Sequence, residues 1–153
     1  MANTYTQIHI QTVFAVKYRH ALIHENWKPD LYKYITTIIQ NNGHKLLIIN
    51  GMPDHLHILI GLRPNQSLSE LMQKTKASSS KWINDQGFTN GRFEWQSGFG
   101  AFSYSKSELP KVINYIKNQE QHHRKKEFQE EYLELLEEFE ITYDERYIFA
   151  GLE

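Results

Sequence analysis

The chain has 153 residues, of which 40% are hydrophobic, and its formal net charge is −1. A chain of this length fits one compact domain with a sizeable core, and no stretch approaches the roughly 20 apolar residues that span a bilayer. The sequence contains no cysteine, which excludes disulfides, a thiol nucleophile and a thiolate metal site. The N-terminus lacks the basic-then-apolar pattern of a signal peptide, so we expect a cytoplasmic protein without a membrane partner.

The charges are segregated along the chain. Residues 1–126 hold 16 Lys and Arg against 8 Asp and Glu, whereas residues 127–153 hold 1 Arg and 10 acids. This asymmetry indicates a basic body that can meet a polyanion, followed by an acidic segment. We therefore divide the chain into a domain over 1–126 and an acidic helix and tail over 127–153, packed on the same domain or on a partner. The acidic run is also typical of a solvated helix face.

The hydrophobic pattern predicts strands and helices in alternation. In chain order, the predicted elements are a strand over 5–17, a helix over 27–42, strands over 44–50 and 54–60, a helix from Ser67 to about residue 86, and a strand in the distal half of 93–104. This order is that of a ferredoxin-like βαββαβ fold of the α+β class, an antiparallel sheet with its helices packed on one face.

Two more helices are predicted after the last strand. The first runs from Ser105 or Ser107 to about His123, with Pro110 in its first turn, and it carries a candidate catalytic tyrosine. The second runs over 127–141 and is amphipathic, with an apolar stripe formed by Phe128, Tyr132, Leu135, Leu136 and Phe139. We expect residues 141–153 to form an extended tail.

Two histidines lie two residues apart in the predicted strand over 54–60. Because successive side chains of a strand point to opposite faces, His55 and His57 share one face, while the other face is pure hydrocarbon. The two imidazoles are close enough to chelate one ion or to bind one phosphate. Taken alone, this short motif more often marks two histidines that are hydrogen-bonded at a sheet edge.

Tyr115 is a candidate nucleophile. It lies four residues before Gln119, so both side chains share one helix face. A phenol attacks poorly at neutral pH unless a cation or a base assists, and a divalent ion on His55 and His57 would assist by polarising a phosphate. With Gln119 as third ligand, the mixed nitrogen and oxygen set suits Mn²⁺ and, less ideally, Mg²⁺. The alternative for Tyr115 is a tyrosine packed in the apolar face of its helix.

Together these motifs resemble a known family. Pro-Asp-His-Leu-His over 53–57, followed by Tyr-Ile-Lys-Asn-Gln over 115–119, resembles the HUH endonucleases, and best the single-tyrosine transposases of small bacterial insertion sequences. The resemblance covers nearly the whole chain. It implies a ferredoxin-like fold, an obligate homodimer, and a metal bound by His55, His57 and Gln119. It also implies that Tyr115 attacks single-stranded DNA at the hairpin ends of a mobile element, giving a 5′-phosphotyrosine link and a free 3′-OH. The family commonly completes each active site in trans.

Basic and aromatic side chains could hold the DNA. The candidates for contacts with the phosphate backbone are Lys74, Lys76, Lys81, Arg92, Lys106, Lys111 and Arg124. The candidates for stacking on unpaired bases are Phe93, Trp95, Phe99, Phe102 and Tyr104. For most of these aromatic residues, a place in the core or in a dimer interface is the favoured alternative.

Two other functions fit parts of the pattern. A replication initiator or relaxase would use the same chemistry to nick an origin, although the compact chain has no helicase or primase region. A non-catalytic nucleic-acid-binding module would use the ferredoxin-like sheet, although the strands lack the aromatic signature of RNA-binding domains.

Overall fold

The computed structural model describes residues 3–122 and 127–144. The described elements are β1 (His9–Ala15), η1 (Lys17–Arg19), α1 (Lys28–Asn41), β2 (Lys45–Met52), β3 (His55–Gly61), α2 (Leu68–Gln86), β4 (Gly100–Tyr104), η2 (Lys106–Glu108), α3 (Leu109–Lys117), α4 (Gln119–His122) and α5 (Phe128–Glu138). Both η elements are short 3₁₀ helices.

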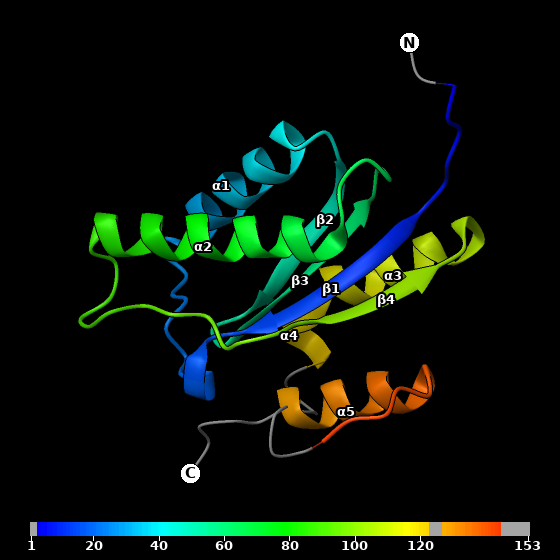
Figure 1. The fold of residues 1–153 in the computed structure, drawn as a ribbon. Coiled ribbons are helices and arrows are strands. Elements are labelled where there is room, and N and C mark those ends of the chain that lie inside the picture. Colours follow the sequence, from blue (N-terminus) through cyan, green and yellow to red (C-terminus); the bar gives the residue numbers. More distant parts are fainter. Residues whose placement is uncertain (1–2, 123–126, 145–153) are drawn as a thin grey trace.

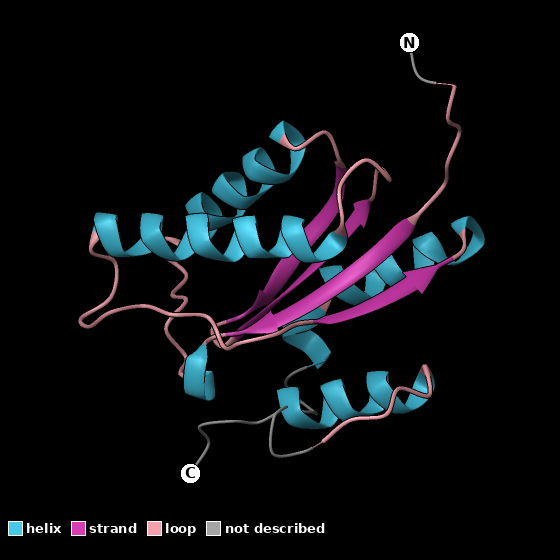
Figure 2. Cartoon of the chain, in the orientation of Figure 1, coloured by secondary structure: helices cyan, strands magenta, loops and turns pink. Residues whose placement is uncertain are grey.

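The strands form one antiparallel sheet in the order β2-β3-β1-β4. This is the strand order of the ferredoxin-like fold, so the predicted α+β class and βαββαβ arrangement are confirmed. Helices α1 and α2 cover one face of the sheet, and α3, α4 and α5 lie on the opposite side (Figures 1 and 2). The central position of β3 is important for the site, because β3 is hydrogen-bonded on both sides.

The two faces of β3 have different environments. Leu56, Ile58 and Ile60 join the main core under α1 and α2. On the opposite face, Leu59 packs against α3 in a smaller cluster with Ile116. The predicted alternation is therefore confirmed, and it directs the intervening histidines toward α3 and α5.

The predicted helix from Ser105 to His123 is divided into η2, α3 and α4. Its start is as predicted, because Ser105 and Glu108 form a capping box. The prediction of one continuous helix is wrong, because α3 ends at Lys117 with Asn118 as its C-cap. The reason lies in β2: the Asn50 amide donates hydrogen bonds to the carbonyls of Ile116 (3.0 Å) and Lys117 (3.1 Å), which satisfies the end of α3 from outside the helix.

Helix α5 packs across the sheet on the side away from α1 and α2. Its buried residues Phe128, Leu135 and Leu136 join a cluster with Val13 and Phe102 from β1 and β4. The amphipathic stripe is thus confirmed, although α5 is shorter than the predicted 127–141. Of the predicted tail, residues 145–153 lie outside the described residues. No helix within 3–122 or 127–144 has the length and apolar character needed to cross a bilayer.

Candidate active site

The two histidines lie in the middle of the sheet and are completely buried. His55 is paired with Ala15 on β1 and Met52 on β2, and His57 is paired with Val13 and Asn50. Their position on a central strand differs from the alternative interpretation of histidines at a sheet edge. The two rings meet edge to face with centroids 5.1 Å apart, so both imidazoles face the same small space.

The Nδ1 atom of each imidazole has its own hydrogen-bond partner. Nδ1 of His55 lies 2.7 Å from a carboxylate oxygen of Asp54, and Nδ1 of His57 lies 2.8 Å from the amide oxygen of Gln11. Gln11 is itself buried, and its amide nitrogen donates to the Tyr104 hydroxyl at 2.8 Å. The acceptors at Nδ1 hold both rings with Nε2 directed into the site, so Nε2 is the nitrogen that each ring can offer to a metal.

Gln119 reaches the same space from α4. It is fully buried, and its amide oxygen lies 3.2 Å from Nε2 of His55. The predicted proximity of Gln119 to the histidine pair therefore agrees with the geometry, although the break at Asn118 separates Gln119 from the helix that carries Tyr115.

Glu131, on α5, lies at the centre of the cluster and was missed from the sequence. Only 3% of its surface is exposed. One carboxylate oxygen, Oε1, lies 3.0 Å from Nε2 of His57 and 3.3 Å from Nε2 of His55. The other oxygen, Oε2, accepts a hydrogen bond from the Gln119 amide at 3.0 Å. A signal was present, because Glu131 lies three residues after Phe128 and four before Leu135, in the apolar stripe of α5.

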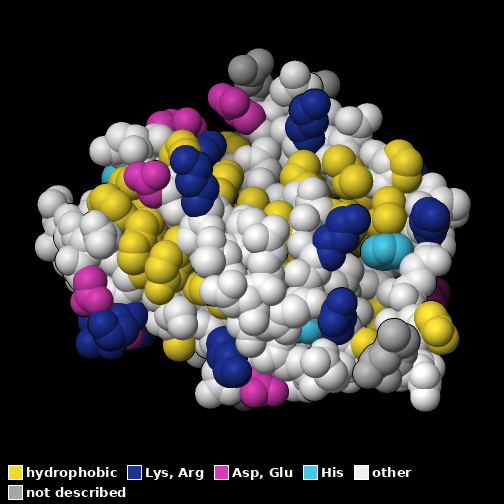
Figure 3. Space-filling view, turned by 90° about the horizontal axis from the view of Figure 1, so that it is seen from above, with side chains coloured by type: hydrophobic (Ala, Val, Ile, Leu, Met, Phe, Trp, Pro, Cys, Tyr) yellow, Lys and Arg dark blue, Asp and Glu magenta, His cyan; other side chains and the backbone are white. Residues whose placement is uncertain are grey.

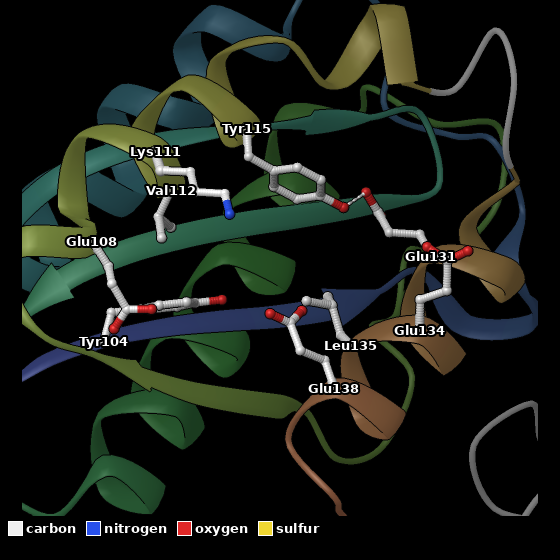
Figure 4. A pocket seen from close by; sticks show the side chains of 9 residues that line it. All are labelled: Tyr104, Glu108, Lys111, Val112, Tyr115, Glu131, Glu134, Leu135 and Glu138. Atoms are coloured by element: carbon white, nitrogen blue, oxygen red, sulfur yellow. Dashed lines mark hydrogen bonds between the residues drawn. The ribbon is translucent and has the colours of Figure 1, made fainter.

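Tyr115 joins the cluster from α3. Its hydroxyl donates a hydrogen bond to Glu131, and its ring lies 5.9 Å from the His57 ring, centroid to centroid. Figure 4 shows the Tyr115 side chain pointing from α3 to Glu131. Both residues line a cavity of about 170 Å³. The candidate nucleophile and the histidine pair of one chain are therefore neighbours.

The family model described as "Transposase IS200 like" matches residues 4–119, about three quarters of the chain and all of the strands. The chain belongs to the IS200-like transposase family. Among curated proteins, the ISDra2 transposase TnpA of Deinococcus radiodurans is 27% identical over 75 residues, which make up 49% of this chain and 54% of that protein. The chain thus matches about half the length of this curated relative.

Two solved structures resemble this IS200-like family member in fold. A crystal structure of a transposase candidate from Deinococcus radiodurans R1 superposes with a TM-score of 0.61 at 21% identity, covering 78% of this chain and 95% of that one. A REP-associated tyrosine transposase, solved bound to a REP hairpin, gives a TM-score of 0.60 at 13% identity, covering 80% and 73%.

Buried charges shift the pKa values of the site. Burial lowers the pKa of His55, but its hydrogen bonds to Asp54 and Glu131 outweigh this effect and raise the pKa to about 9. Burial and the neighbouring Glu131 carboxylate raise the pKa of Tyr115 well above its usual value. The Tyr115 phenol in this family member is therefore protonated at neutral pH.

The donor atoms fit a divalent metal ion. Metal bonds of about 2.0–2.2 Å place neighbouring ligand atoms about 2.8–3.1 Å apart in octahedral geometry and about 3.3–3.6 Å apart in tetrahedral geometry. Three contacts between donor atoms, His55 to Gln119, His55 to Glu131 and His57 to Glu131, measure 3.0–3.3 Å. Within the described residues, donor atoms of His55, His57 and Glu131 all lie within 4.8 Å of one another.

The predicted DNA-binding residues of this IS200-like protein are dispersed. Lys111 lines the cavity beside Tyr115 (Figure 4). Lys74 and Lys81 form ion pairs within α2, on the opposite side of the sheet, and Arg92 lies 3.6 Å from Glu94. Figure 3 looks onto the α1 and α2 side of the molecule, where Lys and Arg side chains are scattered.

The remaining candidates divide into three groups. The Lys76 ammonium donates to the carbonyls of Gln96 and Gly98 at 2.6 and 2.7 Å, so it holds the loop before β4. Lys106 lies in η2, and Arg124 lies outside the described residues. Among the aromatic residues, Phe93, Trp95 and Phe102 are buried in the core, as in the alternative interpretation, and Phe99 and Tyr104 are half-buried.

Proposed function

We propose that this chain is a transposase that cleaves and rejoins single-stranded DNA at the ends of an insertion sequence. Tyr115 is the nucleophile, and His55, His57 and Gln119 hold a divalent metal ion, Mg²⁺ or Mn²⁺. Membership of the IS200-like transposase family supports the transposase role. The observation that carries the rest is that the Tyr115 phenol, both Nε2 atoms and the Gln119 amide converge on one buried point.

The proposed reaction conserves the energy of the DNA linkage. The Tyr115 oxygen forms a bond to phosphorus while the bond from phosphorus to the 3′ oxygen breaks, giving a 5′-phosphotyrosine diester and a free 3′-OH. The phenol loses its proton, and the departing 3′ oxygen gains one. A 3′-OH then attacks the phosphotyrosine diester and releases Tyr115, so strands are rejoined without ATP.

The surrounding residues position the reacting groups. Asp54 and Gln11 hold the two imidazoles in one orientation, and the carboxylate of Glu131 holds the Tyr115 hydroxyl beside them. When bound, the metal ion would polarise the scissile phosphate and stabilise the charge of an in-line displacement. Lys111 extends into the cavity next to Tyr115, where it is suited to an electrostatic contact with a DNA phosphate.

The decisive experiment is a denaturing gel for a covalent protein–DNA species. Purified chain is incubated with a single-stranded hairpin end of its element, with Mn²⁺ or with EDTA. We expect a metal-dependent adduct that Tyr115→Phe abolishes. An adduct in Tyr115→Phe would refute the assignment of the nucleophile. Hairpin binding without any adduct would favour a non-catalytic nucleic-acid-binding module.

We further propose a homodimer whose active sites are each completed within one chain, because Tyr115 lies beside His57 of the same chain. Light scattering measures the oligomeric state. Mixing Tyr115→Phe with His57→Ala tests site assembly: a site completed in cis leaves the mixture inactive, whereas a site completed in trans restores adduct formation in mixed dimers.

A further inference from the structure

We propose that Glu131 is a fourth protein ligand of the metal ion, which makes α5 part of the metal centre. This inference rests on the metal site of the proposed function and extends it to a residue beyond the matched family region, which ends at residue 119. It assigns a defined role to the acidic C-terminal helix.

The first argument is the position of the carboxylate. Oε1 of Glu131 contacts Nε2 of both histidines, at 3.0 and 3.3 Å, and these nitrogens are the ones left for a metal once Asp54 and Gln11 occupy the Nδ1 positions. A carboxylate oxygen in contact with both ligand nitrogens would be able to bind the ion that these nitrogens hold.

The second argument is charge. Two imidazoles, neutral once the ion replaces any proton on Nε2, and an amide would leave the full +2 charge of a divalent ion among completely buried side chains. Adding the Glu131 carboxylate lowers the net charge of the centre to +1. One phosphodiester, which carries a single negative charge, then neutralises it. The set of two nitrogen and two oxygen ligands is also suited to Mn²⁺.

The third argument is the second carboxylate oxygen. Oε2 of Glu131 accepts hydrogen bonds from the Tyr115 hydroxyl and from the Gln119 amide nitrogen. One carboxylate thus connects the nucleophile with the metal ligands. The hydrogen bond from Gln119 also turns its amide oxygen toward His55, the orientation that a ligand requires.

The test is Mn²⁺ affinity, measured by electron paramagnetic resonance on the full chain without DNA. We expect Glu131→Gln to weaken Mn²⁺ binding by about 10-fold or more, the range in which even outer partners of metal ligands act. The matched control is Glu134→Gln, which alters a glutamate on the same helix that lines the same cavity. This control should bind Mn²⁺ like the wild type, and thermal unfolding checks that both variants are folded.

Equal affinity of Glu131→Gln and the wild type would overturn the proposal. Tighter Mn²⁺ binding or increased adduct formation by Glu131→Gln would also overturn the proposal. Either result would mean that the Glu131 carboxylate blocks the metal site and must move away before the ion binds. Absence of Mn²⁺ binding by the wild type itself would instead refute the metal site of the proposed function.

A second measurement needs no variant. Chain labelled with ¹³C at the glutamate carboxyl carbon is loaded with Mn²⁺ and analysed by electron–nuclear double resonance. A carboxylate bound to the ion gives a strong ¹³C coupling, whereas a carboxylate outside the coordination sphere does not. Absence of a strong ¹³C coupling in the wild-type chain would contradict the proposal, even if the Glu131→Gln variant failed to fold.

Discussion

The position of α5 relative to β4 can be tested at Gly100. This buried glycine begins β4 and faces Tyr132 of α5. A Cβ atom at Gly100 would lie 2.6 Å from Cε1 and 2.7 Å from the hydroxyl oxygen of Tyr132. Gly100→Ala therefore inserts a methyl group directly into the contact that seats α5 on the sheet.

The size of the effect follows from this overlap. Carbon atoms are most stable about 3.5–4.0 Å apart, so the Tyr132 ring must retreat by about 1 Å. The ring is stacked on Phe128 with centroids 5.4 Å apart, so this movement also disturbs the stacking. Overpacking of this kind costs about 1–3 kcal/mol. Any shift of α5 also moves Glu131, the residue next to Tyr132, away from the histidines.

The assay is urea unfolding combined with Mn²⁺ titration. We expect Gly100→Ala to lower the unfolding free energy by about 1–3 kcal/mol and to weaken Mn²⁺ binding. The control is Gly61→Ala at the end of β3, where a Cβ would meet Lys45 at an ordinary 3.6 Å. Gly61→Ala should change stability by less than about 0.5 kcal/mol.

A double-mutant cycle identifies the cause. Tyr132→Ala removes the ring, so Gly100→Ala should cost little in that background, with a coupling of about 1 kcal/mol or more between the two sites. If Gly100→Ala is neutral, or costs the same with and without the Tyr132 ring, then α5 is not seated on β4 as described. The proposal for Glu131 would then lose its structural basis.

Three further predictions concern the surroundings of the site. Gln11→Leu should weaken Mn²⁺ binding by about 10–100-fold, because Nδ1 of His57 loses its oxygen acceptor. Gln11→Glu keeps an oxygen acceptor for Nδ1 and should retain most of the Mn²⁺ affinity. An equal loss of affinity in both variants, measured by metal titration, would contradict an orienting role for Gln11. Asn50→Ala should lower the unfolding free energy by about 1–3 kcal/mol in urea unfolding, because it removes two hydrogen bonds at the end of α3. An unchanged urea midpoint would show that these hydrogen bonds do not stabilise the fold. Burial raises the pKa of Tyr104 to about 12, so the folded state keeps a proton that the unfolded state loses near pH 10. The stability of the folded state should therefore fall as the pH rises from about 10 to about 12. Tyr104→Phe should make this fall shallower in alkaline unfolding curves.

Local periodicity was sufficient to place the histidines. The spacing of two residues on a strand determines that His55 and His57 share a face, and the hydrocarbon of Leu56 and Ile58 determines which face turns to the main core. The strand order followed from the sequence of elements for a similar reason, since few topologies accommodate that alternation. These features depend on neighbours in the chain, which a sequence displays directly.

The break in the helix of Tyr115 could not be predicted in this way. The apolar positions stop at Ile116, but the polar residues that follow are equally compatible with an exposed helix that continues, and no proline or glycine marks the end of α3. The end is determined instead by the Asn50 side chain on β2, which is 66 residues away from Ile116 in sequence and competes for its carbonyl. A contact of this kind has no local signature, because a strand asparagine has many other uses.

Glu131 shows how a strong regional pattern conceals a single residue. Ten acids in residues 127–153 suggest a solvated surface, and that interpretation suits most of a helix whose opposite side is apolar. Yet Glu131 is in phase with Phe128 and Leu135, and a carboxylate in that phase must enter the core or distort the stripe. Burial of a carboxylate is tolerated where imidazole, amide and phenol groups contact it, and those groups come from β3, α4 and α3. The phase of one acid within an apolar stripe was therefore more informative than the total charge of its segment.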